Sequence, residues 1–155
     1  MNIRKIIKEE IERILKPNIS DIIREKAQEY IEGGTCNASE INNGLCIEFS
    51  EDIINDMGGY SDNLFELHTD MFFDDNSEQS EFWDGEKIKT DYGVWSLQML
   101  NQHGLPNGVD LKNVTHLPHH AWIYYSGKHY DAESPDGVDN WTELPIFKRY
   151  FNKFR

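Results

Sequence analysis

The stretch HAWIYYSGKHYDAESP, residues 120–135, decides the fold predicted for the C-terminal part of this chain. It holds two runs of β-prone residues, 121–125 and 128–132, separated by Ser126 and Gly127. Two such runs joined by a two-residue connection that contains glycine are typical of a tight β-hairpin. The sequence therefore predicts an antiparallel pair of strands here.

The short loop fixes the register of this hairpin and so sorts its side chains into two faces. Ile123 is expected opposite Tyr130, and Trp122 opposite Asp131. The face predicted to point into the core carries Ala121, Ile123, Tyr125, Tyr130 and Ala132. The other face carries His120, Trp122, Tyr124, His129 and Asp131.

In this register His120 and Asp131 are diagonal neighbours, with backbones about 7–8 Å apart. Side chains that lean together can bridge this gap with a hydrogen bond. A carboxylate on one ring nitrogen fixes the tautomer and leaves the other nitrogen to take a proton from a thiol. We therefore predict His120 as a general base and Asp131 as the group that orients it. The alternative is that both are ordinary strand residues, with Asp131 facing solvent.

Cys46 is predicted to begin a helix. Cys46, Phe49, Ile53 and Met57 share one helical face, and Gly58 and Gly59 then supply a stop signal. A cysteine in the first turn of a helix lies at the positive end of the helix dipole, and a nearby imidazolium lowers its pKa further. Cys46 is thus the predicted nucleophile. The alternative is that it packs as a small hydrophobic residue.

The same position serves to stabilise an oxyanion. The backbone N–H of Cys46 points toward a developing negative charge, and Asn42 or Asn43 is a candidate side-chain donor. Trp122, which shares a face with His120, is a further candidate on the substrate side. Cys36 is the second candidate thiol, and it could also line the cleft or form a redox pair with Cys46.

Two helices are predicted before Cys46. Isoleucines at helical spacing run from Ile3 until Pro17 ends the first helix. The second begins at a cap formed by Asn18 or Ser20 and ends near residue 32, before a pair of glycines. Together they are expected to form an N-terminal helical layer. The polar stretch that follows, residues 34–46, is predicted to be a loop.

Aromatic and acidic residues alternate from residue 61 to residue 91, which indicates short strands or an ordered loop rather than a disordered tail. A short helix is expected over residues 94–103, ending at Gly104. Residues 141–155 are expected to form a basic, aromatic tail.

The composition is that of one globular domain spanning residues 1–155, with 38% hydrophobic and 12% aromatic residues. We expect an α+β fold in which the N-terminal helices pack on a small antiparallel sheet. The formal charge of −13, from 15 basic and 28 acidic residues, argues against nucleic acid or an anionic membrane as a partner.

Neither a signal peptide nor a membrane-spanning stretch is recognised, so a cytoplasmic protein is expected. Two cysteines do not make a disulfide framework, and the spacing of Cys36 and Cys46 matches no zinc pattern. No metal or cofactor is expected. HLPHH leaves a metal site from His116, His119 and His120 as an alternative, although adjacent histidines on a strand diverge.

The order of Cys46, His120 and Asp131 along the chain resembles that of the papain-like and transglutaminase-like superfamily of cysteine hydrolases. HAW followed by G-x-x-YD in residues 120–135 resembles the transglutaminase-core pattern, and NNGLCIEFSEDI, residues 42–53, is similar to the nucleophile helix of small bacterial and phage cysteine peptidases. The resemblance implies a papain-like or transglutaminase-like core. It also implies that Cys46 is the nucleophile, His120 the general base and acid, and Asp131 the orienting residue.

Three functions follow from these residues. The first is a cysteine peptidase or amidase that cleaves an amide, peptide or isopeptide bond through a thioester acyl-enzyme, with a peptide or protein as substrate. The second uses the same residues for acyl transfer or deamidation. The third is a non-catalytic acidic binding or inhibitor protein that uses the surface of residues 62–91.

Overall fold

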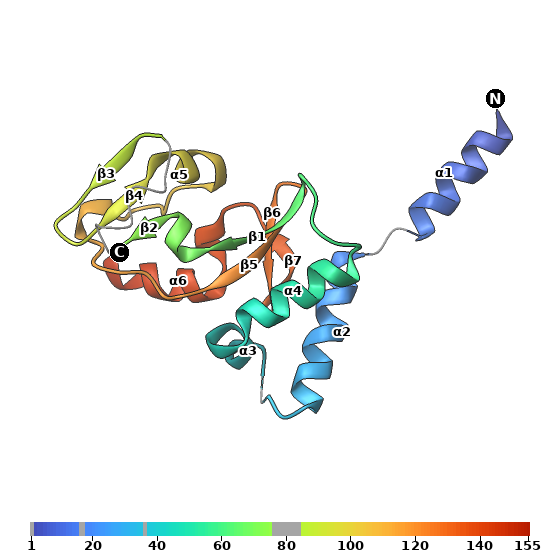
Figure 1. The fold of residues 1–155 in the computed structure, drawn as a ribbon, viewed down its shortest axis with the longest axis horizontal. Coiled ribbons are helices and arrows are strands. Elements are labelled where there is room, and N and C mark those ends of the chain that lie inside the picture. The colour runs from blue at the N-terminus through green and yellow to red at the C-terminus, as the bar shows by residue number, and fades with distance from the viewer. Residues whose placement is uncertain (1, 16–17, 36, 76–84) are drawn as a thin grey trace.

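The computed structural model describes residues 2–15, 18–35, 37–75 and 85–155. It shows a mixed α+β fold, as predicted (Figure 1). Four helices come first: α1 (Ile3–Leu15), α2 (Ile19–Glu32), α3 (Ala38–Gly44) and α4 (Cys46–Asp56). An antiparallel sheet of order β1-β5-β6-β7 is built from β1 (Leu64–His68), β5 (Ala121–Tyr125), β6 (Lys128–Asp131) and β7 (Ser134–Val138).

The remaining elements lie between and after these strands. A smaller sheet of order β2-β4-β3 contains β2 (Phe73–Asp74), β3 (Lys87–Lys89) and β4 (Val94–Ser96). The other helices are α5 (Leu97–His103), α6 (Pro145–Phe151) and the short 3₁₀ turns η1 (Thr69–Met71), η3 (Leu111–Asn113), η4 (Trp141–Glu143) and η5 (Asn152–Phe154). None of the helices in the described ranges has the length and apolarity that a bilayer crossing requires.

The β5–β6 hairpin has the predicted loop and register. Ser126 and Gly127 both have positive φ, 47° and 87°, which is the conformation that a two-residue type I′ turn requires. Ile123 is opposite Tyr130 in the ladder. The side chains of the two strands are therefore distributed as the sequence predicts.

Both faces of this sheet are buried, which corrects the expectation that one face is the core side. Ile123 and Tyr130 pack in a cluster with residues of α2 and α4. On the opposite face Trp122 packs in a second cluster with Trp141 and Phe147. The reason lies at the C-terminus: residues 141–155, expected as a basic, aromatic tail, form η4, α6 and η5, and they cover this face.

The N-terminal helices are only partly as expected. α2 is capped by Asn18, whose side chain accepts the Ser20 N–H at 3.0 Å, and is followed by Gly33 at its C-terminal cap, as predicted. With α4 it packs on the sheet. α1 forms but projects away from the other elements (Figure 1). The expected helical layer therefore consists of α2 and α4 without α1.

Two more expectations need correction. Part of residues 34–46 is not a loop, because the Asn37 side chain accepts the Glu40 N–H at 3.0 Å and starts α3. The helix expected over residues 94–103 begins at Leu97, since residues 94–96 form β4. In the acidic and aromatic segment the expected short strands are present as β1, β2 and β3, and residues 76–84 lie outside the described residues.

Candidate active site

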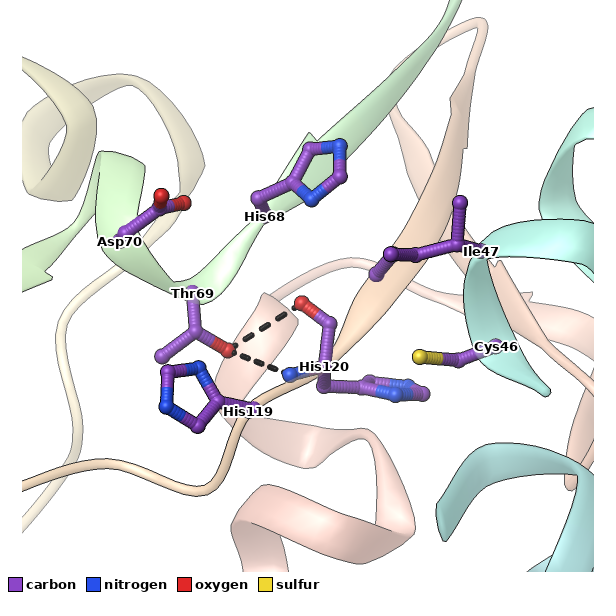
Figure 2. Close-up of a pocket in the computed structure, with 8 residues that line it drawn as sticks. Cys46, Ile47, His68, Thr69, Asp70, His119 and His120 are labelled. Carbon is purple, nitrogen blue, oxygen red and sulfur yellow. Dashed lines mark hydrogen bonds between the residues drawn. The ribbon is translucent and has the colours of Figure 1, made fainter. Parts of the chain in front are cut away.

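Cys46 is the first residue of α4 and is half-buried. Leu45 occupies the cap position, and its apolar side chain makes no capping bond to the N–H groups of the first turn. Figure 2 shows the Cys46 sulfur pointing toward the imidazole of His120. The predicted helix start is confirmed, and it brings the thiol to the hairpin.

A pocket of about 120 Å³ opens beside these two side chains. Its lining comes from the start of α4, the end of β1, η1 and the start of β5: Cys46, Ile47, His68, Thr69, Asp70, His119, His120 and Ala121. The thiol is thus accessible from one side, whereas the imidazole is packed behind it.

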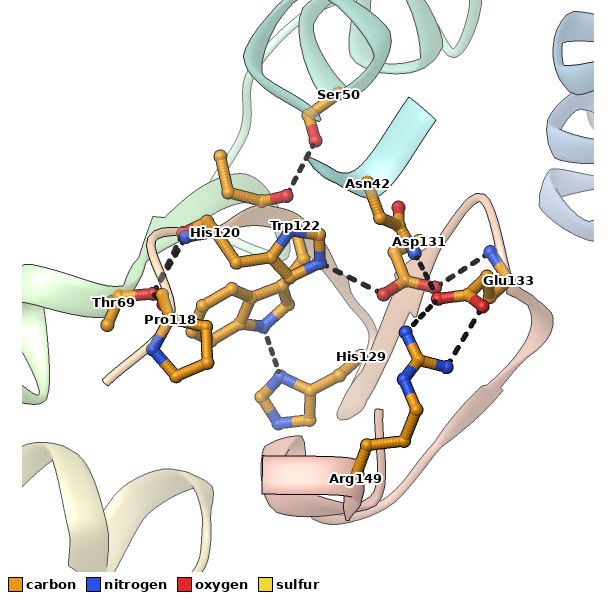
Figure 3. Close-up of polar contacts among 11 residues, drawn as sticks. Asn42, Ser50, Thr69, Pro118, His120, Trp122, His129, Asp131, Glu133 and Arg149 are labelled. Atoms are coloured by element: carbon orange, nitrogen blue, oxygen red, sulfur yellow. Dashed lines mark hydrogen bonds and ion pairs between the residues drawn. The ribbon is translucent and has the colours of Figure 1, made fainter. Parts of the chain in front are cut away.

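His120 and Asp131 form the hydrogen bond that the register predicts. The Nε2 atom of His120 lies 3.0 Å from Oδ2 of Asp131, and their side chains are 0% and 2% exposed (Figure 3). Among the described residues, Nδ1 of His120 has no hydrogen-bond partner although it is buried. An unsatisfied buried nitrogen is costly and uncommon, and this one belongs to the ring that faces the thiol.

The electrostatics of the pair favour charge separation. Burial raises the pKa of the Cys46 thiol, but the adjacent His120 imidazole, the N–H groups of Ala121 and Ile47 and the positive charge on His120 outweigh it, so the pKa is lowered overall. Burial lowers the pKa of His120, whereas Asp131 and then Cys46 raise it to about 9 overall. Both shifts favour a thiolate–imidazolium pair near neutral pH, which titrates as a unit.

Thr69 holds the backbone of His120 in place. Its hydroxyl accepts the His120 N–H at 2.9 Å and donates to the Pro118 carbonyl at 2.8 Å. Its own N–H donates to the His120 carbonyl at 3.0 Å. The imidazole is stacked on Trp122, with ring centroids 5.9 Å apart and an interplanar angle of 21°. The ring is therefore restrained from both its backbone and its face.

Glu133 anchors Asp131 from the other side. The Glu133 N–H donates to Oδ1 of Asp131 at 3.0 Å. Its carboxylate accepts two hydrogen bonds of 3.1 Å from Arg149 and one of 2.9 Å from Asn42 (Figure 3). Burial raises the pKa of Glu133, but Arg149 and Asn42 lower it overall. Arg149 of α6 and Asn42 of α3 are thereby tied to the segment that carries Asp131.

His68 adds a second imidazole to the pocket wall. Its Nε2 lies 2.6 Å from Oε1 of Glu66, and this hydrogen bond raises its pKa against the opposing effect of burial. Sequence reasoning missed His68, Thr69 and Asp70 because they reach the site through the pairing of β1 with β5, in which His68 is opposite Ala121. The sequence signal that could have identified them is the run of three polar residues, His-Thr-Asp, directly after the strand-like residues 64–67.

Asn42, Asn43 and Trp122, predicted to contact an oxyanion or substrate, do not line the pocket beside Cys46. The amide nitrogen of Asn42 donates to Glu133, and that of Asn43 donates to Ser39 at 3.4 Å on the exposed side of α3. The indole N–H of Trp122 donates to Nδ1 of His129 at 3.0 Å. None of these N–H groups points into the pocket beside Cys46. The backbone N–H groups at the start of α4 are left as the donors.

His116, His119, His129 and Cys36 were the alternative candidates for the site. His129 is buried and bound to Trp122, and burial together with His103 lowers its pKa to about 3. His116 bonds to Thr115 at 2.9 Å outside the pocket, and His119 lies on the pocket wall. Cys36 lies outside the described residues. Within the described ranges, no three His, Cys, Asp or Glu side chains are arranged to hold a metal ion.

Comparisons with known proteins identify no relative of this chain. Protein-family models, curated proteins and solved structures were each searched, and none matches this chain.

Proposed function

We propose that the protein is a cysteine-nucleophile hydrolase with Cys46 as nucleophile, His120 as general acid and base, and Asp131 as the orienting residue. The observation that carries the proposal is the two-sided environment of His120, whose Nε2 is bound to a buried carboxylate while its buried Nδ1 has no partner among the described residues. The ring faces a thiol whose pKa is lowered.

The fold supports the same proposal. A cysteine at a helix start and a histidine and an acid on an antiparallel hairpin follow the chain order of a papain-like or transglutaminase-like core. The hydrogen bond from His120 to Asp131 supports an orienting role for this carboxylate, and Trp122 covers a face of the imidazole. We infer this superfamily from the arrangement of the site.

The chemistry proceeds through a thioester. The Cys46 thiolate attacks the carbonyl carbon of an amide, and a C–S bond forms while the carbonyl oxygen takes the negative charge. The N–H groups at the positive end of α4 stabilise this oxyanion. The His120 imidazolium then gives its proton to the leaving amine as the C–N bond breaks.

Water completes the cycle. The neutral His120 accepts a proton from the attacking water, a C–O bond forms, and the C–S bond breaks to release the acid and the thiolate. The proton on His120 restores the imidazolium, so that the resting ion pair is regenerated. Throughout, Asp131 keeps the ring oriented and stabilises its positive charge.

An activated ester tests the proposal without knowledge of the natural substrate. Incubated with p-nitrophenyl acetate, the protein should release p-nitrophenol and carry one acetyl group on Cys46, as read by peptide mass spectrometry. Cys46→Ala should lose this acetylation, whereas Cys36→Ala, which removes the other thiol, should retain it. A burst of unchanged size in Cys46→Ala, with acetyl found on Cys36 or on lysines, would overturn the proposal.

Acyl transfer and deamidation proceed from the same thioester and differ only in what resolves it. Adding glycinamide to the acetylated enzyme distinguishes hydrolysis from transfer. A hydrolase yields acetate at nearly the same rate, whereas an acyl transferase yields N-acetylglycinamide. The half-buried position of Cys46 beside a small pocket leaves space for water.

The non-catalytic alternative has weaker support. The large aromatic residues that would anchor a partner on the surface of residues 62–91 include Phe72 and Phe73, which are 0% and 4% exposed. They pack in the core instead of facing outward.

A further inference from the structure

The α1 helix presents an apolar ridge to solvent. Ile3, Ile7 and Ile11 are spaced by four residues and are 66%, 53% and 50% exposed, with Ile6 beside them at 46%. Residues at this spacing lie in a row on one side of a helix. Figure 1 shows α1 standing away from the other described elements, in agreement with the exposure of these isoleucines.

A helix of 13 residues gains little stability from its own hydrogen bonds. Helices of this length in proteins are usually held by packing of their apolar side. Large exposed apolar rows mark surfaces that associate with another body. The exposed isoleucine row of α1 is therefore expected to bind a partner. The distribution of charge along the helix indicates the kind of partner.

Charge is segregated along α1. The N-terminal half carries Arg4, Lys5 and Lys8, whereas the C-terminal half carries Glu9, Glu10 and Glu12 with a single basic residue, Arg13. When two copies of this helix run antiparallel, the basic half of each lies along the acidic half of the other. In a parallel pair like charges would face like charges. Opposed helix dipoles also favour the antiparallel arrangement.

The two apolar ridges fit the same arrangement. Rows of residues at i, i+4 and i+8 interlock when two helices pack with their rows in each other's grooves. Centring the contact on Ile7 places Ile3 of one copy near Ile11 of the other. The two copies are then related by a two-fold axis, so both ridges are covered at once.

We propose that the protein forms a homodimer in which the α1 helices of two copies pack antiparallel through Ile3, Ile7 and Ile11. A bilayer fits the helix less well, because Glu9, Glu10 and the chain's formal charge of −13 oppose binding to anionic lipid. The dimer does not depend on the proposed catalytic activity, and its test needs no substrate.

Sedimentation velocity of the full chain tests the dimer, with a reducing agent present to exclude disulfide-linked species. Between 1 and roughly 200 µM the mass should rise from 18.2 kDa toward twice that value. Ile7→Asp should raise the dissociation constant at least 100-fold, on the order of the loss of a buried apolar centre. Leu105→Asp is the matched control, since Leu105 is 45% exposed but lies outside α1. It should leave the dimer intact.

Charge reversal tests the orientation. E9K/E10K makes each chain less negative, which by itself reduces repulsion between copies. The antiparallel arrangement nevertheless predicts that this variant dimerises about 10-fold more weakly, because basic halves then meet basic side chains. Mixing it with R4E/K5E should restore association as a heterodimer. Circular dichroism confirms that each variant keeps its fold.

Three results would overturn the proposal. They are a monomer at every concentration, a dimer that Ile7→Asp leaves intact, and a dimer that E9K/E10K strengthens. A monomer that instead binds neutral or anionic vesicles through α1 would assign the ridge to lipid.

Discussion

Two histidines on the β5–β6 hairpin show how much a single partner changes the chemistry of a buried imidazole. His120 and His129 are 4% and 1% exposed. His120 faces the carboxylate of Asp131, and its pKa is raised to about 9. His129 accepts the indole N–H of Trp122, and its pKa is lowered to about 3.

Burial disfavours the charged form of both rings and so lowers both pKa values. For His120 the carboxylate of Asp131, together with Cys46, more than offsets this effect. His120 can carry a proton at neutral pH, as the proposed acid–base role requires. His129 remains neutral and supports Trp122, which packs against His120. One end of the hairpin is therefore suited to acid–base chemistry and the other to structure.

The largest effect is expected from removing the imidazole of His120, the proposed general base. His120→Ala should lower the rate of Cys46 acetylation by p-nitrophenyl acetate by about 1,000-fold, because the thiol then lacks both its proton acceptor and the charge that lowers its pKa. His129→Asn, which keeps an acceptor for the Trp122 N–H, should change the rate less than about threefold. Stopped-flow absorbance of p-nitrophenol measures both. Similar losses in the two variants would contradict the distinction.

Removing the carboxylate should make His120 behave more like His129. Asp131→Asn should lower the acetylation rate by about 100-fold or more, because the amide favours the wrong tautomer and leaves the imidazolium uncompensated. The free energy of unfolding should also fall by about 3 kcal/mol, since a buried pair loses one partner. Urea titration followed by tryptophan fluorescence provides the second value. An unchanged rate would show that Asp131 has no orienting function.

The two histidines should affect stability at opposite ends of the pH range. The folded pKa of His129 lies below the ordinary value of 6.5, so its contribution is complete above that pH and is lost as pH falls toward 3. The loss amounts to about 2 kcal/mol at pH 5. His120, with a raised pKa, contributes fully below pH 6.5, and its contribution is lost as pH rises through about 9.

Urea unfolding at pH 5, 7 and 9.5 tests both contributions. His129→Asn should flatten the loss of stability between pH 7 and 5 without changing the alkaline side. Asp131→Asn should flatten the alkaline side. If His129→Asn leaves the acid dependence unchanged, protonation of His129 is not its cause.

The anchor of Asp131 should have a smaller effect. Glu133→Gln keeps the backbone bond to Asp131 but removes the charge that Arg149 binds. We expect an acetylation rate about 5- to 10-fold lower, with a shifted pH profile, because Glu133 acts on His120 only through Asp131 and through its charge. Lys148→Met on the same α6 helix removes a positive charge outside this network and is the control. A uniform loss of protein stability without a shift in the pH profile would assign Glu133 a structural role alone.

Local signals predicted the half of the site that lies on the hairpin. The two-residue turn fixes the register, so the contact between His120 and Asp131 follows from the sequence of residues 120–131 alone. The spacing of apolar residues likewise placed Cys46 at a helix start. These features depend on neighbours in the chain, which periodicity and turn chemistry describe well.

The other half depends on contacts between distant segments. Thr69 reaches His120 through the pairing of β1 with β5, and Arg149 reaches Glu133 because α6 folds back over the sheet. Residues 141–155 were expected to form a basic, aromatic tail. Their aromatic rings instead bury against Trp122, an outcome that no local pattern indicates.

The pH dependence of Cys46 alkylation by iodoacetamide tests the central claim most directly. In a Cys36→Ala background, a thiolate paired with His120 predicts a rate that stays high from neutral pH to well below the ordinary cysteine pKa of about 8.5. The profile of His120→Ala should shift to a single titration near or above that value. A wild-type rate that titrates near 8.5 and does not change in His120→Ala would contradict the pairing of these two residues.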